Sequence, residues 1–131
     1  YLAVRTKFHG PRFPVFIVIA NREYEAWFLA SLESIAGQLI EGRPGLPADV
    51  TYNGDVENIK GVKGWLSRQM PDGRAYKERL DQAPLTSMID IELACSKSRS
   101  FRRICHAVEL AVEAIDSRTI VVSPPPQSSH A

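Results

Sequence analysis

The run Pro14-Val15-Phe16-Ile17-Val18-Ile19-Ala20 is apolar at every position and rich in β-branched residues. A strand of this composition is typical of a mostly parallel sheet that is covered on both faces. After Asn21 the apolar positions change to the three-and-four spacing of an amphipathic helix, and they are Tyr24, Trp27, Phe28, Ser31, Leu32 and Ile35. The chain is therefore predicted to be α/β, with one central buried strand near residues 14–20 and Asn21 as the N-cap of a helix that runs to about residue 38.

Several further helices are predicted downstream. Apolar spacing and turn signals place them at 59–70, at 76–80, from Pro84 onward, at 90–97 and at 101–115, the last with Ser100 as its cap. The glycine- and proline-rich stretch 42–55 predicts a long surface loop, and residues 119–122 predict a short late strand.

The length and net charge of the chain limit the classes of protein to which it can belong. A chain of 131 residues with 44% hydrophobic content suits one domain, and its net charge of +1 argues against wholesale wrapping of nucleic acid. No apolar run approaches the roughly 18 to 20 residues that span a bilayer, so we expect a cytoplasmic protein without a membrane partner. Cys95 and Cys105 fall on apolar helical stripes and are expected to be buried thiols rather than a disulfide.

Composition divides the chain into three predicted segments. Residues 1–12 form an irregular basic lead-in that contains no acid, residues 13–117 form the domain, and residues 118–131 form a short strand and a proline-rich tail. The chain opens at Tyr1, and Met70 and Met88 are both internal. We therefore expect a longer native protein.

A set of motifs in a fixed order resembles a known group. Asn21, Tyr24, Glu25 and Trp27 match a pattern Asn-x-x-aromatic-Glu-x-Trp that follows a strand, and three later pieces match as well: Lys63-Gly64-Trp65-Leu66, Asp81-Gln82-Ala83-Pro84-Leu85-Thr86 and Ser98-Arg99-Ser100-Phe101-Arg102. Over roughly residues 15–110 the chain resembles the C-terminal part of small bacterial Toprim-like proteins. Within that group it is most similar to a family of unknown function that is often encoded beside an ATPase and is linked to antiphage defence.

The resemblance implies a partial Toprim-like, Rossmann-like domain and a metal-dependent nuclease that hydrolyses phosphodiesters with magnesium. Toprim-like domains hold the ion with a glutamate in a glycine-rich turn after the first strand and with a later Asp-x-Asp pair. Neither motif is present. No aspartate or glutamate precedes Phe13, and Asp90-Ile91-Glu92 has the spacing of an Asp-x-Asp pair but is predicted to be helical. We therefore expect this chain to be inactive alone, with the missing acids supplied by the full-length protein.

The resemblance also implies roles for three acids. Glu25 matches the family glutamate and is the candidate metal ligand and catalytic acid, with Glu23 as a weaker catalytic candidate and Asp81 as a second metal ligand. Each has a structural alternative. An acid in a first helical turn complements the helix dipole, Glu23 points about 200° away from Glu25 on a helix, and Asp81 could cap the helix at Pro84.

A basic cluster precedes and begins the last predicted helix, and its members are Lys97, Arg99, Arg102 and Arg103. Acids crowd the end of the same helix at Glu109, Glu113 and Asp116. Both groups oppose the helix dipole and cost stability. An anion such as a nucleic-acid backbone at the N-terminus would offset that cost, and Lys60 and Lys63 would extend the basic surface. The alternative is a solvated charged face.

A second class of function stays open, which is a non-catalytic interaction module that docks on an ATPase or on its own twin. A strand at residues 15–20 without its neighbours would expose an unpaired edge and an apolar face. The sequence therefore predicts a homo-oligomer if this segment is the real species.

Overall fold

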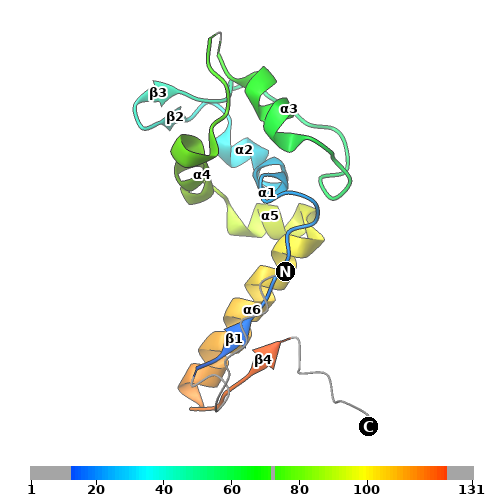
Figure 1. The fold of residues 1–131 in the computed structure, drawn as a ribbon, viewed down its shortest axis with the longest axis vertical. Helices are drawn as coiled ribbons and strands as arrows, with labels where there is room; N and C mark the ends of the chain where they lie inside the picture. Colours follow the sequence, from blue (N-terminus) through cyan, green and yellow to red (C-terminus); the bar gives the residue numbers. More distant parts are fainter. Residues whose placement is uncertain (1–12, 72, 124–131) are drawn as a thin grey trace. The chain divides into compact units, whose positions relative to one another are not determined.

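The computed structural model describes residues 13–71 and 73–123. These residues form a mixed α/β arrangement of helices α1 to α6 with two small two-stranded sheets (Figure 1). The chain divides into two compact units. The central unit comprises Ile19–Arg102, and the terminal unit combines Tyr1–Val18 with Arg103–Ala131. The terminal unit thus joins both ends of the sequence, and most of the predicted lead-in and tail lies outside the described residues.

The described part of the terminal unit holds a parallel strand pair. Strand β1 (Val15–Phe16) pairs with β4 (Val122–Ser123), and the Val15 amide donates to the Val121 carbonyl at 2.9 Å. Helix α6 (Arg99–Asp116) enters this unit at Arg103. The parallel pairing agrees with the predicted α/β class, and the late strand lies slightly beyond its predicted position at 119–122.

The prediction of a central strand buried over residues 14–20 is wrong. The strand is confined to Val15 and Phe16, both half-buried, while Ile17 and Ile19 are 53% and 71% exposed. An unbroken apolar run indicates burial only where further strands and a second layer cover it. Among the described residues, β1 has a single hydrogen-bonded neighbour, β4, so most of the run stays uncovered.

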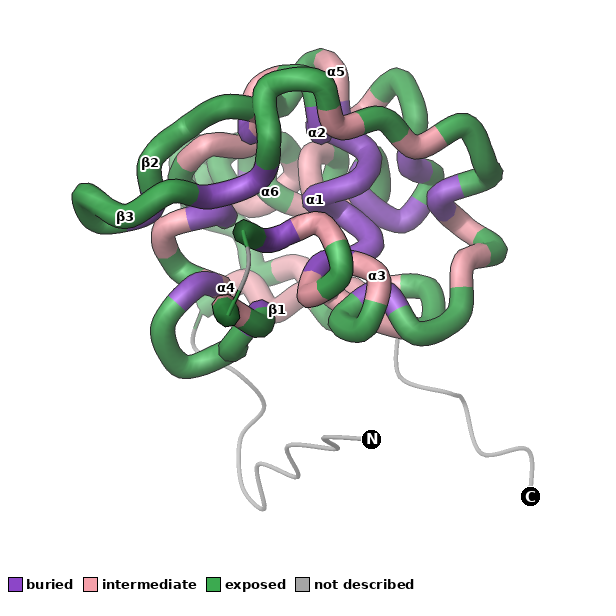
Figure 2. Tube along the Cα trace, turned by 90° about the horizontal axis from the view of Figure 1, so that it is seen from above, coloured by how far each residue is buried: buried purple, intermediate pink, exposed green. Residues whose placement is uncertain are grey.

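The core of the central unit is built around α1 (Ala26–Ala30), whose residues are all buried (Figure 2). Helix α1 packs against α2 (Leu32–Ile35) and against α5 (Ile91–Lys97). The single helix predicted to reach residue 38 is thus two short helices, separated at Ser31, where φ is −127° and ψ is 32°. Asn21 is not its N-cap; Glu25 holds that position, and its side chain makes no capping hydrogen bond.

A β-hairpin begins where a loop was predicted. Strands β2 (Leu39–Ile40) and β3 (Arg43–Pro44) are antiparallel, and the two residues between them, Glu41 and Gly42, have φ values of +50° and +77°. Positive φ at both positions is the signature of a type I′ turn, which matches the twist of paired strands. The loop proper occupies residues 45–61, and buried Leu46 and Val56 anchor it to the core.

The remaining helices follow the predicted spacing with shifted ends. Helix α3 (Val62–Gln69) starts after Gly61, where φ is +70°. Helix α4 (Glu78–Ser87) is one element rather than two, and it carries Pro84 inside at the cost of one backbone hydrogen bond. The hydroxyl of Ser98, not Ser100, caps α6, since it accepts from the Phe101 amide at 3.1 Å. No helix in the described residues is long and apolar enough to cross a membrane.

Candidate functional site

Three of the four family-like motifs meet around α1 in the central unit, namely those at residues 21–27, 81–86 and 98–102. The Trp27 indole Nε1 donates to Ser100 Oγ at 2.8 Å, and the Tyr24 hydroxyl lies 2.9 Å from the hydroxyl oxygen of Thr86. The Trp27 ring also contacts Phe101 edge-on, with 5.7 Å between centroids. Pieces far apart in the sequence are therefore joined by direct side-chain contacts, which gives the shared motifs a structural role.

Glu25 lies in the core beneath these contacts and is 2% exposed. Its Oε1 accepts hydrogen bonds from the Tyr76 hydroxyl at 3.0 Å and from Gln82 Nε2 at 3.2 Å. Burial raises the pKa of Tyr76 far above its ordinary value, and the Glu25 carboxylate that accepts a hydrogen bond from its hydroxyl raises that pKa further. The Glu25 carboxylate is thus held by uncharged donors inside the protein.

Asp81 is equally buried and is bonded at both oxygens. Oδ1 accepts from Arg74 Nη2 in a salt bridge, and Oδ2 accepts from the Lys77 amide at 2.8 Å. The second bond satisfies a backbone donor at the start of α4. Asp81 therefore caps the helix that contains Pro84, although that helix begins at Glu78.

Glu23 is half-buried and lies in the connection between β1 and α1. Its Oε1 accepts from the Gly61 amide at 3.1 Å, while its buried Oε2 has no hydrogen-bond partner among the described residues. A buried carboxylate oxygen without a donor is costly. Among the three predicted catalytic or metal-binding acids, Glu23 is the one with a buried carboxylate oxygen that lacks a hydrogen-bond partner in the described structure.

The described residues do not fit a magnesium site. They contain no group of three or more histidine, cysteine, aspartate or glutamate side chains that could hold a metal ion. Glu25 Oε1 and both oxygens of Asp81 are already bonded to the protein. A metal ion at Glu25 Oε1 or at Asp81 would have to displace these donors.

The predicted nucleic-acid residues are exposed, but several already have partners. Lys97 pairs with Glu33, Lys63 pairs with Glu78, and Arg102 Nη1 donates to the Cys95 carbonyl at 2.6 Å. Arg99, Arg103 and Lys60 complete the predicted set. Arg103 is the first residue of this stretch in the terminal unit, whereas the other members belong to the central unit.

A carboxylate that the sequence argument missed lies at the start of α6. Glu57 Oε1 accepts from the Ser98 hydroxyl at 2.7 Å and from the Ser100 amide at 3.2 Å, and Asn21 Nδ2 donates to Oε2 at 3.1 Å. Burial raises the pKa of Glu57, but these hydrogen bonds lower it by more, so the net shift is downward. The protein's own anion thus occupies the position that the sequence argument gave to a phosphate.

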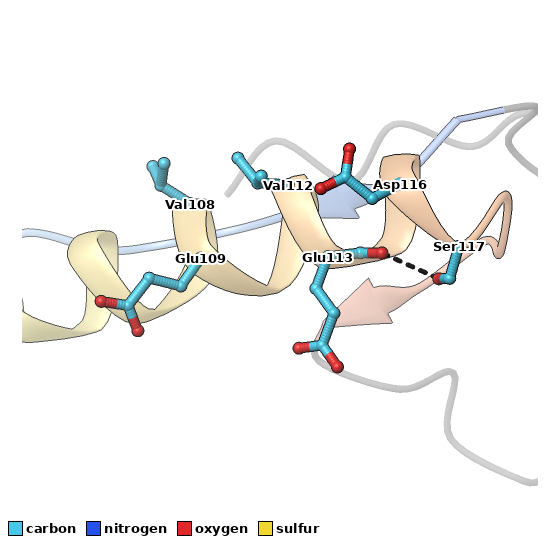
Figure 3. Close-up of a pocket in the computed structure, with 6 residues that line it drawn as sticks. All are labelled: Val108, Glu109, Val112, Glu113, Asp116 and Ser117. Carbon is cyan, nitrogen blue, oxygen red and sulfur yellow. Dashed lines mark hydrogen bonds between the residues drawn. The ribbon is translucent and has the colours of Figure 1, made fainter.

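Helix α6 carries an exposed apolar stripe in the terminal unit. Val108, Val112 and Ile115, here called the α6 stripe, are 57%, 52% and 64% exposed. Glu109, Glu113 and Asp116, here called the acidic edge, lie beside it, and Val108, Val112, the acidic edge and Ser117 line one surface depression. Figure 3 shows the two valines pointing to one side of α6, with Glu109 and Glu113 on the neighbouring side.

Comparison with known proteins identifies one family. The family model described as "Domain of unknown function (DUF4276)" matches residues 2–109. No curated protein and no solved structure matches the chain significantly.

Proposed function

We propose that this chain, which belongs to the family described as a domain of unknown function (DUF4276), is a non-catalytic interaction module. It would bind another protein chain through the α6 stripe. The observation that carries the proposal is the exposure of Val108, Val112 and Ile115 on one side of α6. Full burial of each such side chain would contribute about 1.5 to 3 kcal/mol. Because these three side chains are 52% to 64% exposed, roughly half of that stabilisation is available to a partner.

The spacing of the α6 stripe supports this mode of binding. Val108, Val112 and Ile115 stand at positions i, i+4 and i+7 of one helix. This is the spacing by which an amphipathic helix presents apolar anchors to a partner. Helix α6 has 18 residues, which is long enough to present all three anchors on a rigid element.

Two kinds of partner are candidates. The resemblance to the Toprim-like group suggests the first, and the two-stranded β1–β4 sheet suggests the second. One is an ATPase encoded beside the gene, and the other is a second copy of the chain. Among the described residues β1 pairs with β4 alone, and its other edge supports association in general, because an unpaired strand edge invites pairing with another chain.

Site-specific photo-crosslinking tests the proposal in the cells from which the protein comes. A benzophenone amino acid at Val112 is expected to yield covalent adducts with a second polypeptide. The matched control is Leu80 on α4, which is also apolar and 46% exposed. Adducts from Val112 but not from Leu80 support the proposal, whereas no adduct from Val112, or equal adducts from both positions, contradicts it.

A second candidate is the catalytic one. The intact gene product would be a Toprim-like, magnesium-dependent nuclease of which this chain is an inactive part. The parallel β1–β4 pairing and the unpartnered Oε2 of Glu23, which follows β1 in the sequence, favour it. A plasmid-nicking assay with magnesium tests it on this chain and on the full gene product. Activity of the full product that Glu23→Gln abolishes supports the nuclease, and no activity in the full product with its ATPase contradicts it.

A further inference from the structure

We infer that the segment that binds the α6 stripe is an amphipathic helix of another protein whose apolar face is bordered by lysine or arginine. The inference rests on the proposed function and names the chemistry of the partner. Its basis is the acidic edge, which places Glu109, Glu113 and Asp116 along the same depression as Val108 and Val112.

The acidic edge has little compensation inside the protein. Among the described residues, its one contact within 4.0 Å with a basic side chain joins Glu109 to His106 on the same helix, which is an ion pair only when the imidazole is protonated, and both side chains are more than two-thirds exposed. Glu113 and Asp116 form no such pair in the described part of the chain. Three carboxylates therefore face solvent beside exposed apolar groups.

The position of these acids on α6 is also unfavourable. Glu113 and Asp116 lie in the last turn of α6, and the described structure places no basic residue in that turn. Negative charge at a helix C-terminus opposes the dipole and is destabilising. At the other end of α6 the protein supplies the compensating charge itself, through Glu57. Cations from a partner would do the same for the C-terminal end.

The same charges disfavour two other occupants. Phosphates of a nucleic acid would be repelled by the acidic edge. Two copies packed stripe to stripe with antiparallel α6 helices, about a two-fold axis perpendicular to them, would set one acidic edge against the other. A basic amphipathic helix meets both the apolar and the ionic requirement.

Designed peptides test the inference on the whole chain. The first probe is a helical peptide of about 16 residues with leucines at three-and-four spacing and lysines along both borders. The second is identical except that glutamate replaces each lysine. Fluorescence anisotropy measures each Kd, and NMR shift mapping locates the contact. We expect the lysine probe to bind at Val108, Val112 and Ile115, at least about tenfold more tightly than the glutamate probe, with affinity that falls as salt rises.

Two variants with equal loss of charge separate the acidic edge from general electrostatics. The test variant is Glu109→Gln/Glu113→Gln/Asp116→Asn, and the control is Glu41→Gln/Asp49→Asn/Glu92→Gln, which alters three exposed acids outside α6. The test variant should weaken binding of the lysine probe about tenfold and flatten its salt dependence. The control variant should bind as the parent does.

Equal binding of the two probes, or an equal loss in the test and control variants, overturns the inference. An affinity of the parent chain for the lysine probe that stays constant as salt rises overturns it as well. Adducts from Val112 that join two copies of this chain would also overturn the inference while leaving the proposed function standing. Absence of any adduct from Val112 would remove the proposed function itself.

Discussion

The carboxylate of Glu57 lies at the start of α6 and accepts hydrogen bonds from Ser98 and Ser100, which are more than 40 residues further along the chain. The first turn of α6 contains no acid of its own and two arginines, Arg99 and Arg102. Glu57 therefore offsets the dipole and the basic side chains from a distant loop. Basic residues at the N-terminus of a helix destabilise it, and in α6 the tertiary contact with Glu57 offsets that destabilisation.

Replacement of Glu57 by glutamine should make stability less dependent on pH. The folded pKa of Glu57 lies below its ordinary value of 4.5, so its contribution is complete above that value and is lost as pH falls through the lowered folded pKa. We expect Glu57→Gln to cost about 1 to 2 kcal/mol at neutral pH and almost nothing in strong acid. Urea denaturation across that range measures the difference, and an equal cost at both ends would contradict it.

Glu25 and Asp81 are expected to act through packing and hydrogen bonding. Tyr76→Phe removes a donor from the buried Glu25 carboxylate, and we expect a loss of about 1 to 3 kcal/mol in the free energy of unfolding. Magnesium should leave the unfolding midpoint of the parent unchanged, because a ligand stabilises only the state that binds it. Calorimetry with and without the ion decides this, and a magnesium-dependent rise that Glu25→Gln abolishes would restore the metal-ligand hypothesis.

Among the secondary-structure elements, the spacing of apolar residues in the sequence located most helices, whereas tertiary contacts determined where the helices end. The spacing of Ile59, Val62, Leu66 and Met70 gave α3 correctly, since an apolar stripe is a local property. The division of the first helix at Ser31, the continuation of α4 through Pro84 and the type I′ hairpin depend on contacts that no local pattern encodes. The acids of the predicted site were chosen by resemblance, and their burial could not be inferred from spacing.

The basic residues at the N-terminal end of α6 are predicted to bind a nucleic-acid backbone. If Arg99, Arg102 and Arg103 hold a phosphate backbone, changing all three to glutamine should weaken binding of every sequence and flatten the salt dependence by about 0.7 to 0.9 per lost contact. The variant with lysine at all three positions keeps the charge and should retain most of the affinity. Unaltered binding of single- and double-stranded probes by the glutamine variant at low salt would show that these arginines are a solvated surface.

At the scale of the whole molecule, apolar surface is distributed unevenly. Both units expose some large apolar side chains, but the central unit buries the entire length of α1, whereas the terminal unit leaves Phe13, Ile17 and the α6 stripe exposed. The sequence pattern identified the apolar positions of α6, but it could not show which of them the rest of the chain would cover. That difference is what turns a predicted core face into a proposed docking surface.

The most direct test of the docking surface is the free energy of unfolding of Val108→Asn/Val112→Asn, measured by urea denaturation. Valine and asparagine have similar helix propensity, so the comparison reports on burial. Because both valines are more than half exposed, we predict a change within about 0.5 kcal/mol per substitution. A loss of about 2 to 5 kcal/mol, as for residues in a packed core, would mean that the chain itself covers the α6 stripe and would contradict the account.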